Sequence, residues 1–459
     1  MSKRKTKKKS ELKSFIENKI SGLNKTEKIL YTDSLYGTDS ATTAIKNRFN
    51  STFIIPFALA LNAPPAFIAL ISSVPLLVGS FFQLFVADLM KIVRRRKEII
   101  VFTSLLDAML WIPILLIPFL WNNNYVLLLN IIILQSIALS LLRPFYNSLI
   151  GDIMPIYKRG KILGNMNMIS SGAAFFGNLL FGFILSLFEN INIFMGFAII
   201  FFIQAILRTF AATVRARYTD KPLDLGNKMQ SLLNFGKNLR KTNFGKFVLF
   251  SSLIQFALGV SRPFFAPYML EYLGWNMMTF TLITSASIVS SLVVLKAWGQ
   301  HIDKRGSRWM LSISGLLIPF FPLLWIFFKE PVYFLFFQFI TGAVWAAYDL
   351  STATFIMDAT DRKSRIILNA YYHFFLGVFI FAGSMLGGLI MQFIPKDFFI
   401  NSYHLVFGLS VVIRVCISFY FIPKLRDERF INIKFKGKEN EIFIMPHRGF
   451  FEIDSKKRK

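Results

Sequence analysis

Long apolar runs separated by short charged clusters constrain this chain more than any other feature. Hydrophobic residues make up 54% of the 459 residues and charged residues only 17%, whereas about a quarter of a soluble protein is charged. A helix needs roughly 20 apolar residues to cross about 30 Å of hydrocarbon. The pattern excludes a soluble domain and a disordered chain, and a sole cysteine, Cys416, excludes a disulfide scaffold. We predict an all-α polytopic membrane protein.

Twelve segments of the chain meet this length criterion. They cover residues 39–62, 65–88, 98–120, 125–150, 162–187, 191–213, 246–271, 276–299, 309–328, 332–357, 366–393 and 401–422. The first span is the most polar, with Lys46, Arg48, Asn50 and Ser51. We therefore expect it to line a water-accessible interior instead of facing lipid.

The distribution of basic residues explains the net charge of +27. Outside the spans, Lys and Arg are concentrated in both tails and in the even-numbered connections, and the odd-numbered connections carry only Lys329 and Lys396. The positive-inside rule then predicts cytoplasmic termini, and the plasma membrane is the expected location. Nucleic acid, the usual partner of such a charge in soluble proteins, is not expected.

The two basic tails have some pattern of their own. Apolar residues recur at helical spacing in residues 1–38, which form either a helix on the anionic inner leaflet or a solvated tail. In residues 425–459, alternating Ile431 and Ile433 precede Ile442 and Ile444 across a Lys-Gly-Lys segment. This alternation predicts a small cytoplasmic hairpin.

The two halves of the chain repeat each other. At one constant offset, Asp152 corresponds to Asp358 and Arg159 to Arg365. Since each half has six spans, both halves share one orientation and are related by an axis along the membrane normal. The resulting units are a six-helix bundle at 39–213, a cytoplasmic linker at 214–245 and a second six-helix bundle at 246–424.

A loop motif in the second half carries a family resemblance. The segment that contains Gly299, Asp303, Arg305, Gly306 and Arg308 resembles the Gly-x-x-x-Asp-Arg-x-Gly-x-Arg loop of the major facilitator superfamily. The first-half copy is degraded and retains only its aspartate. Together with the spans and the repeat, the resemblance implies two pseudo-symmetric bundles that open a central site to each side of the membrane in turn.

The resemblance also implies roles for the loop residues. Loops of this kind latch the two halves together on the cytoplasmic side, and the alternative is simple anchoring in the headgroup region. The proposed gating carboxylates are Asp88 and Asp303, with Arg305 and Arg308 as cationic partners, and the proposed charge clasps are Asp152 with Arg159 and Asp358 with Arg365. Glycine-rich stretches in spans five and eleven permit close helix approach, either for sliding or for permanent packing.

Charges inside the spans are functional candidates, because a charge in the bilayer is costly unless it is paired or hydrated. The resemblance implies that spans one, four, seven and ten line the cavity. Their charges are Lys46, Arg48, Arg143, Arg262 and Asp349. This excess of cations favours an anionic or zwitterionic substrate.

Arg143 and Asp349 obey the repeat offset, so we expect them at similar depth on opposite cavity walls. They would form a charge pair at the substrate site or a gating salt bridge. Arg262 is the best candidate for substrate binding, and Asp349 could carry a coupling proton. The predicted polar and aromatic lining includes Asn50, Tyr146, Tyr268 and Trp345.

Other intramembrane charges are assigned structural roles. Asp107 is expected to pair with Arg208, although Arg208 lies near enough to the inner face to extend its head group into water. Arg414 has no obvious partner, and His373 is expected to be a hydrogen-bonded structural residue. A membrane-embedded enzyme would require Asp107, Asp349 and His373 to converge.

No motif for catalysis, metal binding or a cofactor is evident. We therefore predict a monomeric secondary active transporter of a small solute, with proton coupling as one option for its energy source and the lipid bilayer as its other partner. A drug or lipid exporter of the same fold and a non-transporting membrane sensor are the alternatives.

Overall fold

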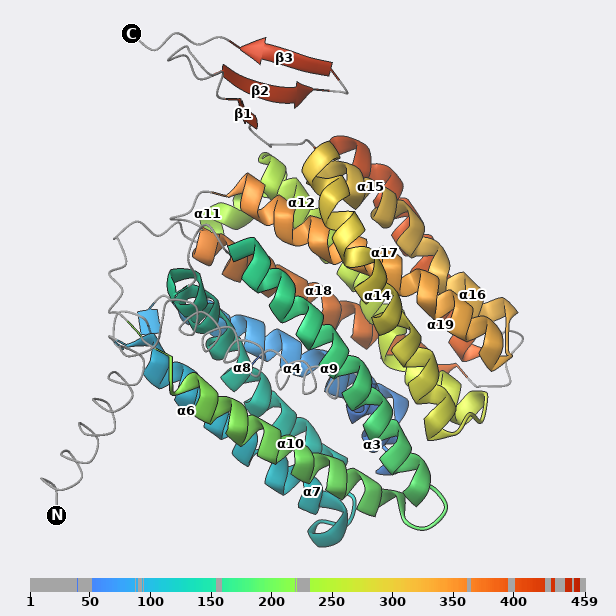
Figure 1. Cartoon of the computed structure of the whole chain (residues 1–459). Helices are drawn as coiled ribbons and strands as arrows, with labels where there is room; N and C mark the ends of the chain where they lie inside the picture. The colour runs from blue at the N-terminus through green and yellow to red at the C-terminus, as the bar shows by residue number, and fades with distance from the viewer. Residues whose placement is uncertain are drawn as a thin grey trace, which may run out of the picture.

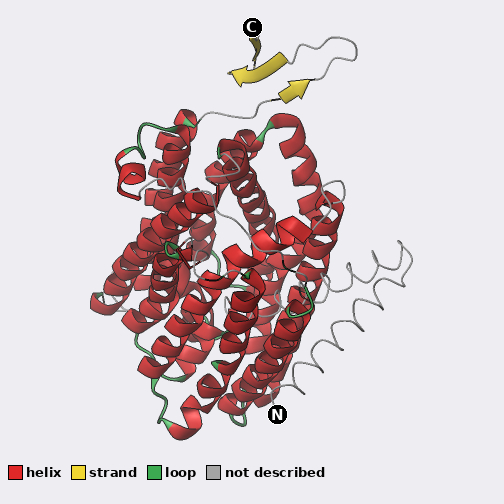
Figure 2. Ribbon diagram, turned by 90° about the vertical axis from the view of Figure 1, so that its left-hand side faces the viewer, coloured by secondary structure: helices red, strands yellow, loops and turns green. Residues whose placement is uncertain are grey.

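The computed structural model describes most of the chain, and the described residues of the predicted membrane spans are almost all helical (Figures 1 and 2). The described residues are 39, 52–86, 88–89, 93, 95–153, 159–218, 220, 232–360, 365–394, 401–425, 431–433, 442–447 and 450–454. Eleven of the described helices or helix pairs are long and apolar enough to cross a membrane, and they coincide with predicted spans two to twelve. Most of span one lies outside the described residues.

The N-terminal half is a bundle of long helices, with α3 as the described part of span one. Its helices are α3 (Ile54–Ala60), α4 (Pro65–Gln83), α6 (Arg96–Met109), α7 (Trp111–Leu120), α8 (Tyr125–Ile153), α9 (Arg159–Phe188) and α10 (Ile193–Arg215). A core of buried aromatic and aliphatic side chains, among them Phe57, Trp111 and Phe201, joins α3, α7 and α10.

The C-terminal half repeats this arrangement after the short linker helix α11 (Leu232–Lys237). Its helices are α12 (Asn243–Ser261), η2 (Arg262–Phe264), α13 (Phe265–Pro267), η3 (Tyr268–Tyr272), α14 (Met277–Arg305), α15 (Ser307–Leu317), η4 (Ile318–Phe320), α16 (Phe321–Phe327), α17 (Pro331–Ala359), α18 (Arg365–Phe393), α19 (Ser402–Phe421) and η5 (Ile422–Lys424). The prediction of two six-helix halves is confirmed.

A small antiparallel sheet follows the last span. It consists of β1 (Ile431–Ile433), β2 (Ile442–His447) and β3 (Phe450–Asp454). Ile431 pairs with Ile444 and Ile433 with Ile442, which confirms the predicted hairpin and adds a third strand to it.

The two halves meet along two helix pairs that are side by side in Figure 1, α4 with α18 and α9 with α14. Small residues permit both contacts. A Cβ atom added to Gly388 would lie 2.8 Å from the Cβ atom of Ala69, and one added to Gly182 would collide with Thr281. Larger side chains at these glycines would push the halves apart.

The α9–α14 contact also contains polar bonds. Asn178 Nδ2 donates a hydrogen bond to Ser285 Oγ at 2.6 Å, and the backbone N–H of Met277 donates to the Glu189 carboxylate at 3.2 Å. These residues belong to the end of α9 and the beginning of α14, so this contact lies at the end of the bundle opposite the linker. We call this end the far end and the other the linker end.

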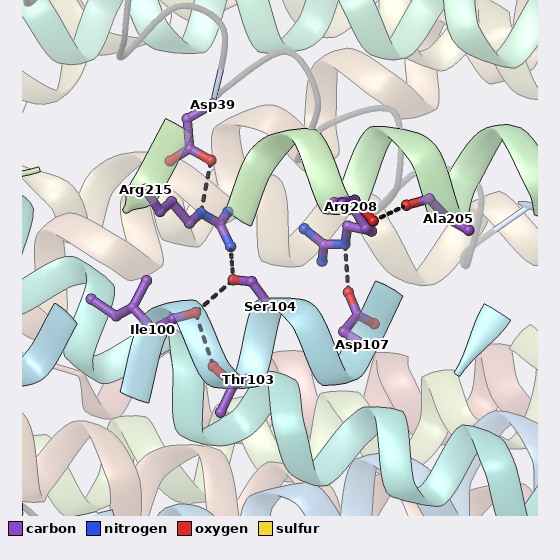
Figure 3. Close-up of polar contacts among 9 residues, drawn as sticks. Asp39, Ile100, Thr103, Ser104, Asp107, Ala205, Arg208 and Arg215 are labelled. Atoms are coloured by element: carbon purple, nitrogen blue, oxygen red, sulfur yellow. Dashed lines mark hydrogen bonds and ion pairs between the residues drawn. The ribbon is translucent and has the colours of Figure 1, made fainter. Parts of the chain in front are cut away.

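Two buried ion pairs join α10 to the rest of the N-terminal half (Figure 3). Arg208 Nε lies 2.5 Å from Asp107 Oδ2, and their side chains are 1% and 0% exposed. The predicted pair is therefore confirmed, and the alternative that Arg208 extends to the surface is wrong. Two helical turns further on, Arg215 donates to Asp39 Oδ1 at 2.8 Å and to Ser104 Oγ at 2.7 Å.

We expect Asp107→Asn to destabilise the N-terminal half, because it leaves Arg208 buried without its counter-charge. Breaking one partner of a buried pair typically costs about 3–5 kcal/mol. The measurement is thermal unfolding of the purified protein. The Asp107→Asn/Arg208→Met double variant should recover part of the loss, and Asp88→Asn, a change at an exposed carboxylate, is the control. Equal midpoints for the Asp107→Asn variant and the parent would contradict a stabilising role.

Candidate functional site

The seventh span is interrupted at the residue that we expected to bind substrate. Its helix α12 ends at Ser261, and a 3₁₀ turn begins at Arg262. Pro263 causes the break, since it has no N–H to donate to the carbonyl of Gly259. Ser384 Oγ on α18 donates to that carbonyl instead, at 3.3 Å. Pro263 is buried, whereas the side chain of Arg262 is exposed.

Asp349 lies on α17, where its side chain is exposed although its neighbour Tyr348 is buried. The charges of Asp349 and Arg262 influence each other, but no ion pair within 4 Å joins them among the described residues. The pairing of Arg143 with Asp349 stays a prediction. The repeat offset relates Asp349 to Arg143 and says nothing about residues of its own half.

Arg143 lies on α8, one residue before Pro144, and it too is exposed. Its charge interacts with His373 on α18, which belongs to the other half. The His373 ring also lies edge-on to Tyr372, with centroids 5.2 Å apart. His373 makes no hydrogen bond within the described residues, so the expected role of a hydrogen-bonded structural histidine is wrong for this conformation.

Arg143, Arg262 and Asp349 are all exposed side chains on helices α8 and α17 and at the break in the seventh span. The described α9–α14 contact closes the far end, as the bonds of Asn178 and Glu189 show. The lining of a central cavity by Arg143, Arg262 and Asp349 stays a prediction.

The expected aromatic lining is only partly present. Trp345 is half-buried and packs edge-to-face on Tyr348, with ring centroids 5.5 Å apart. Tyr268 is fully buried, and its hydroxyl donates to the carbonyl oxygen of Trp325 at 2.9 Å. Its predicted role in substrate lining is therefore wrong for this conformation, because the ring belongs to an aromatic core.

Tyr146 on α8 belongs to the N-terminal polar network. Its ring makes a cation–π contact with the guanidinium of Arg215, whose Cζ atom lies 5.1 Å from the ring centroid. Arg215 in turn bonds Asp39 and Ser104 (Figure 3). This network connects the polar side of α8 to α6 and α10, one helical turn from Arg143.

The second-half loop motif has the expected backbone but different side-chain contacts. Gly306 separates α14 from α15 with a φ of 86°, a conformation that favours glycine. The guanidinium of Arg305 lies 4.6 Å from the centre of the Trp309 ring. Asp358 accepts a hydrogen bond from Ser307 Oγ at 3.3 Å. The loop is thus tied to α15 and α17 of its own half.

The first-half loop is tied to the linker, a contact that the sequence analysis missed. Arg96 Nη2 lies 3.1 Å from Asp220 Oδ1, and the backbone N–H of Lys97 donates to Asp220 Oδ2 at 2.9 Å. Asp220 therefore caps the positive end of α6. The sequence held only a weak signal of this contact. Basic residues stand at the start of a helix, and an aspartate follows far along the chain.

Several predicted site residues lie wholly or partly outside the described part of the structure. Arg48 and Asn50 lie outside the described residues, and so does the N-terminal tail, residues 1–38, for which a helix on the inner leaflet was predicted. For four others the structure describes the backbone but not the side chain: Asp152, Arg159, Asp303 and Arg365. Gly299 and Arg308 are half-buried, and Asp88 is exposed. Within the described part of the chain, no cluster of His, Cys, Asp and Glu is suited to a metal ion.

A membrane-embedded duplicated bundle with charges inside its spans defines a transport protein of the two-bundle type. The sequence profile of the Major Facilitator Superfamily matches residues 40–261 and, as a second copy, residues 247–447. The chain belongs to the major facilitator superfamily. It is therefore a non-enzymatic membrane transporter. No curated protein matches the sequence.

Solved structures of other transporters share the fold. The nucleoside transporter NupG superposes with a TM-score of 0.63 at 13% identity, over 85% of this chain and 97% of its own. A bacterial homologue of the lysosomal transporter Spinster, in an inward-facing and occupied conformation, gives 0.66 at 14% identity, over 86% and 97%. A POT family transporter bound to a peptide conjugate gives 0.66 at 12% identity, over 86% and 96%. These identities establish the fold alone.

Proposed function

We propose that this transporter moves a small anionic or zwitterionic solute by alternating access, with Arg143 and Arg262 as its anion-binding groups. The supporting observation is that Arg143, Arg262 and Asp349, on the spans expected to line the cavity, have exposed side chains. In a low-dielectric site, uncompensated positive charge binds an anion strongly. A drug exporter would not need these cations, and no described contact favours that alternative.

The described conformation is open toward the linker end in this proposal. The bonds of Asn178 and Glu189 hold the far end together, and the central charges remain accessible. The linker end is the cytoplasmic end if the basic connections follow the positive-inside rule. The opposite conformation requires the α9–α14 contact to separate and the linker ends of the bundles to close.

Asp349 is the proposed coupling site. In the described conformation Arg262 compensates its charge. An anionic substrate competes for Arg262, and a carboxylate that loses its cationic partner in a partly desolvated site takes up a proton more readily. Substrate binding and proton binding would thereby favour each other.

Replacing Arg262 tests the substrate site. We expect Arg262→Ala to raise the apparent substrate constant about 10- to 100-fold, since a charge-assisted hydrogen bond contributes roughly 1.5–3 kcal/mol. Arg262→Lys retains the charge without the planar fork and should give a smaller increase. The measurement is uptake into proteoliposomes, normalised to the amount of inserted protein. A fall in inserted protein that accounts for the whole loss of uptake would remove Arg262 from the site.

Replacing Asp349 separates coupling from transport. We expect Asp349→Asn to abolish accumulation driven by a proton gradient, because an amide cannot exchange the proton, and to leave substrate counterflow within a few-fold of the parent. Glu330→Gln, at an exposed carboxylate just before the first residue of α17 and 19 residues from Asp349, is the matched control. Proton-driven accumulation by Asp349→Asn at the parent rate would rule out this residue as the coupling site.

Cross-linking the far end tests alternating access. Asn178 and Ser285 touch across the halves, so Asn178→Cys and Ser285→Cys should form a disulfide on oxidation, in a Cys416→Ser background. We expect the cross-link to stop net flux and reduction to restore it, with ligand binding retained throughout. Undiminished flux in the cross-linked protein would contradict the mechanism. Binding without flux in the reduced protein under every gradient would instead favour a sensor.

A further inference from the structure

A fully buried arginine on the last transmembrane helix has no role in the site as described so far. Arg414 lies on α19, and its side chain is 2% exposed. No carboxylate contacts it within the described residues, and its Nε atom has no hydrogen-bond partner there. The other buried arginines among the described residues, Arg96, Arg208 and Arg215, each pair with an aspartate. Arg414 therefore needs another source of compensating negative potential.

The contacts of Arg414 lead to the break in the seventh span. Its Nη2 atom donates to Ser261 Oγ at 2.8 Å. The hydroxyl of Ser261 also lies 3.1 Å from that of Ser410, which donates to the carbonyl oxygen of Ala257 at 2.5 Å. Ser261 is the last residue of α12, so α19 holds the end of this helix through two of its own side chains.

The end of α12 supplies the missing counter-charge. The last carbonyl groups of a helix carry a partial negative charge, and a cation at this end is stabilised. At Pro263 the chain continues as a 3₁₀ turn and further helix to Tyr272, but Pro263 leaves the carbonyl of Gly259 without its main-chain donor. Ser384 donates to that carbonyl and Ser410 to the carbonyl of Ala257. The guanidinium of Arg414 joins this group of polar contacts through Ser261.

We propose that Arg414 is a positioning residue for Arg262. By fixing Ser261 from α19, it sets the rotation of the chain at the break and directs the next side chain, Arg262, toward Asp349. Ser261 is fully buried and Arg262 is exposed, which is the arrangement that such a fixed break produces. The consequence for substrate rests on the proposed function, because there Arg262 is an anion-binding group.

The test measures the accessibility of position 262 and requires no substrate. Arg262→Cys in a Cys416→Ser background is allowed to react with a membrane-impermeant, water-soluble thiosulfonate, and the modification rate is determined. We expect Arg414→Met, which removes the charge and keeps the length, to slow modification at least five-fold. Arg414→Lys should stay within two-fold. Val412→Met, at an exposed position of the same helix, is the control and should have no effect.

A modification rate within two-fold of the reference in Arg414→Met would overturn the proposal and leave Arg414 as a purely structural residue. If Arg414→Met does not fold, Ser261→Ala replaces it, since this change removes only the acceptor. We expect Ser261→Ala to slow modification at least three-fold, and an unchanged rate would again overturn the proposal.

A transport measurement separates this proposal from the proposed function. With Arg262 restored and a transported anion in hand, Arg414→Met should raise KM about ten-fold and leave kcat within two-fold, whereas Arg414→Lys should keep both. Slower modification at position 262 together with an unchanged KM would retain the positioning role and refute the assignment of Arg262 to the substrate site. A general loss of stability in Arg414→Met would change kcat and KM together. Arg414→Lys would then not selectively restore either constant.

Discussion

The free-energy cost of placing a charge in hydrocarbon is the constraint on which this structure depends. A charged side chain within a span must be paired, hydrated or placed against a helix end. The chain uses all three solutions. Asp107 with Arg208 is paired and buried, Arg414 lies at the end of α12, and Arg143, Arg262 and Asp349 remain accessible to water. Exposure thus separates the charges that hold the bundles together from those available to a ligand.

The packing between the halves follows a related division. Within each half, an aromatic core packs the helices together, and in the N-terminal half buried ion pairs add to it. Between the halves, the described contacts combine small residues such as Gly388 and Ala69 with a few polar bonds at the far end. Small residues pack closely without interlocking, and a small number of hydrogen bonds can be exchanged for water. Such an interface allows the two halves to rock against each other, as the transporter family requires.

The sequence predicted the fold in detail because its determining signals are long. A span of about 20 apolar residues and a repeat over half the chain are hard to misread, and spans two to twelve coincide with the helices of the structure. Among the site residues, the Asp107–Arg208 pair was predictable because two opposite charges inside spans of one half must find each other. The alternating isoleucines likewise predicted the C-terminal hairpin.

Contacts that depend on helix rotation could not be predicted. The charge of Asp349 is influenced by Arg262, which lies at the break in the seventh span and is unrelated to Asp349 by the repeat offset. Tyr268 appeared suited to a cavity wall but belongs to a core, where the carbonyl of Trp325 satisfies its hydroxyl. The Asp220–Arg96 contact joins a linker to a loop, and no periodic pattern encodes such a contact. Hydrophobic periodicity predicts where a helix forms. The rotation of that helix about its own axis depends on contacts with residues that are distant in sequence.

The central claim is that Arg143 and Asp349 face water between the two halves. Spin labels at these two positions, and at the exposed Phe102 on α6 as the lipid-facing reference, allow a direct comparison of collision rates with a water-soluble nickel complex and with oxygen in bilayers. The account predicts that the labels at 143 and 349 collide preferentially with the nickel complex and the label at 102 with oxygen. Preferential collision with oxygen at 143 and 349 would mean that these charges face lipid, and the transport site described above would not exist.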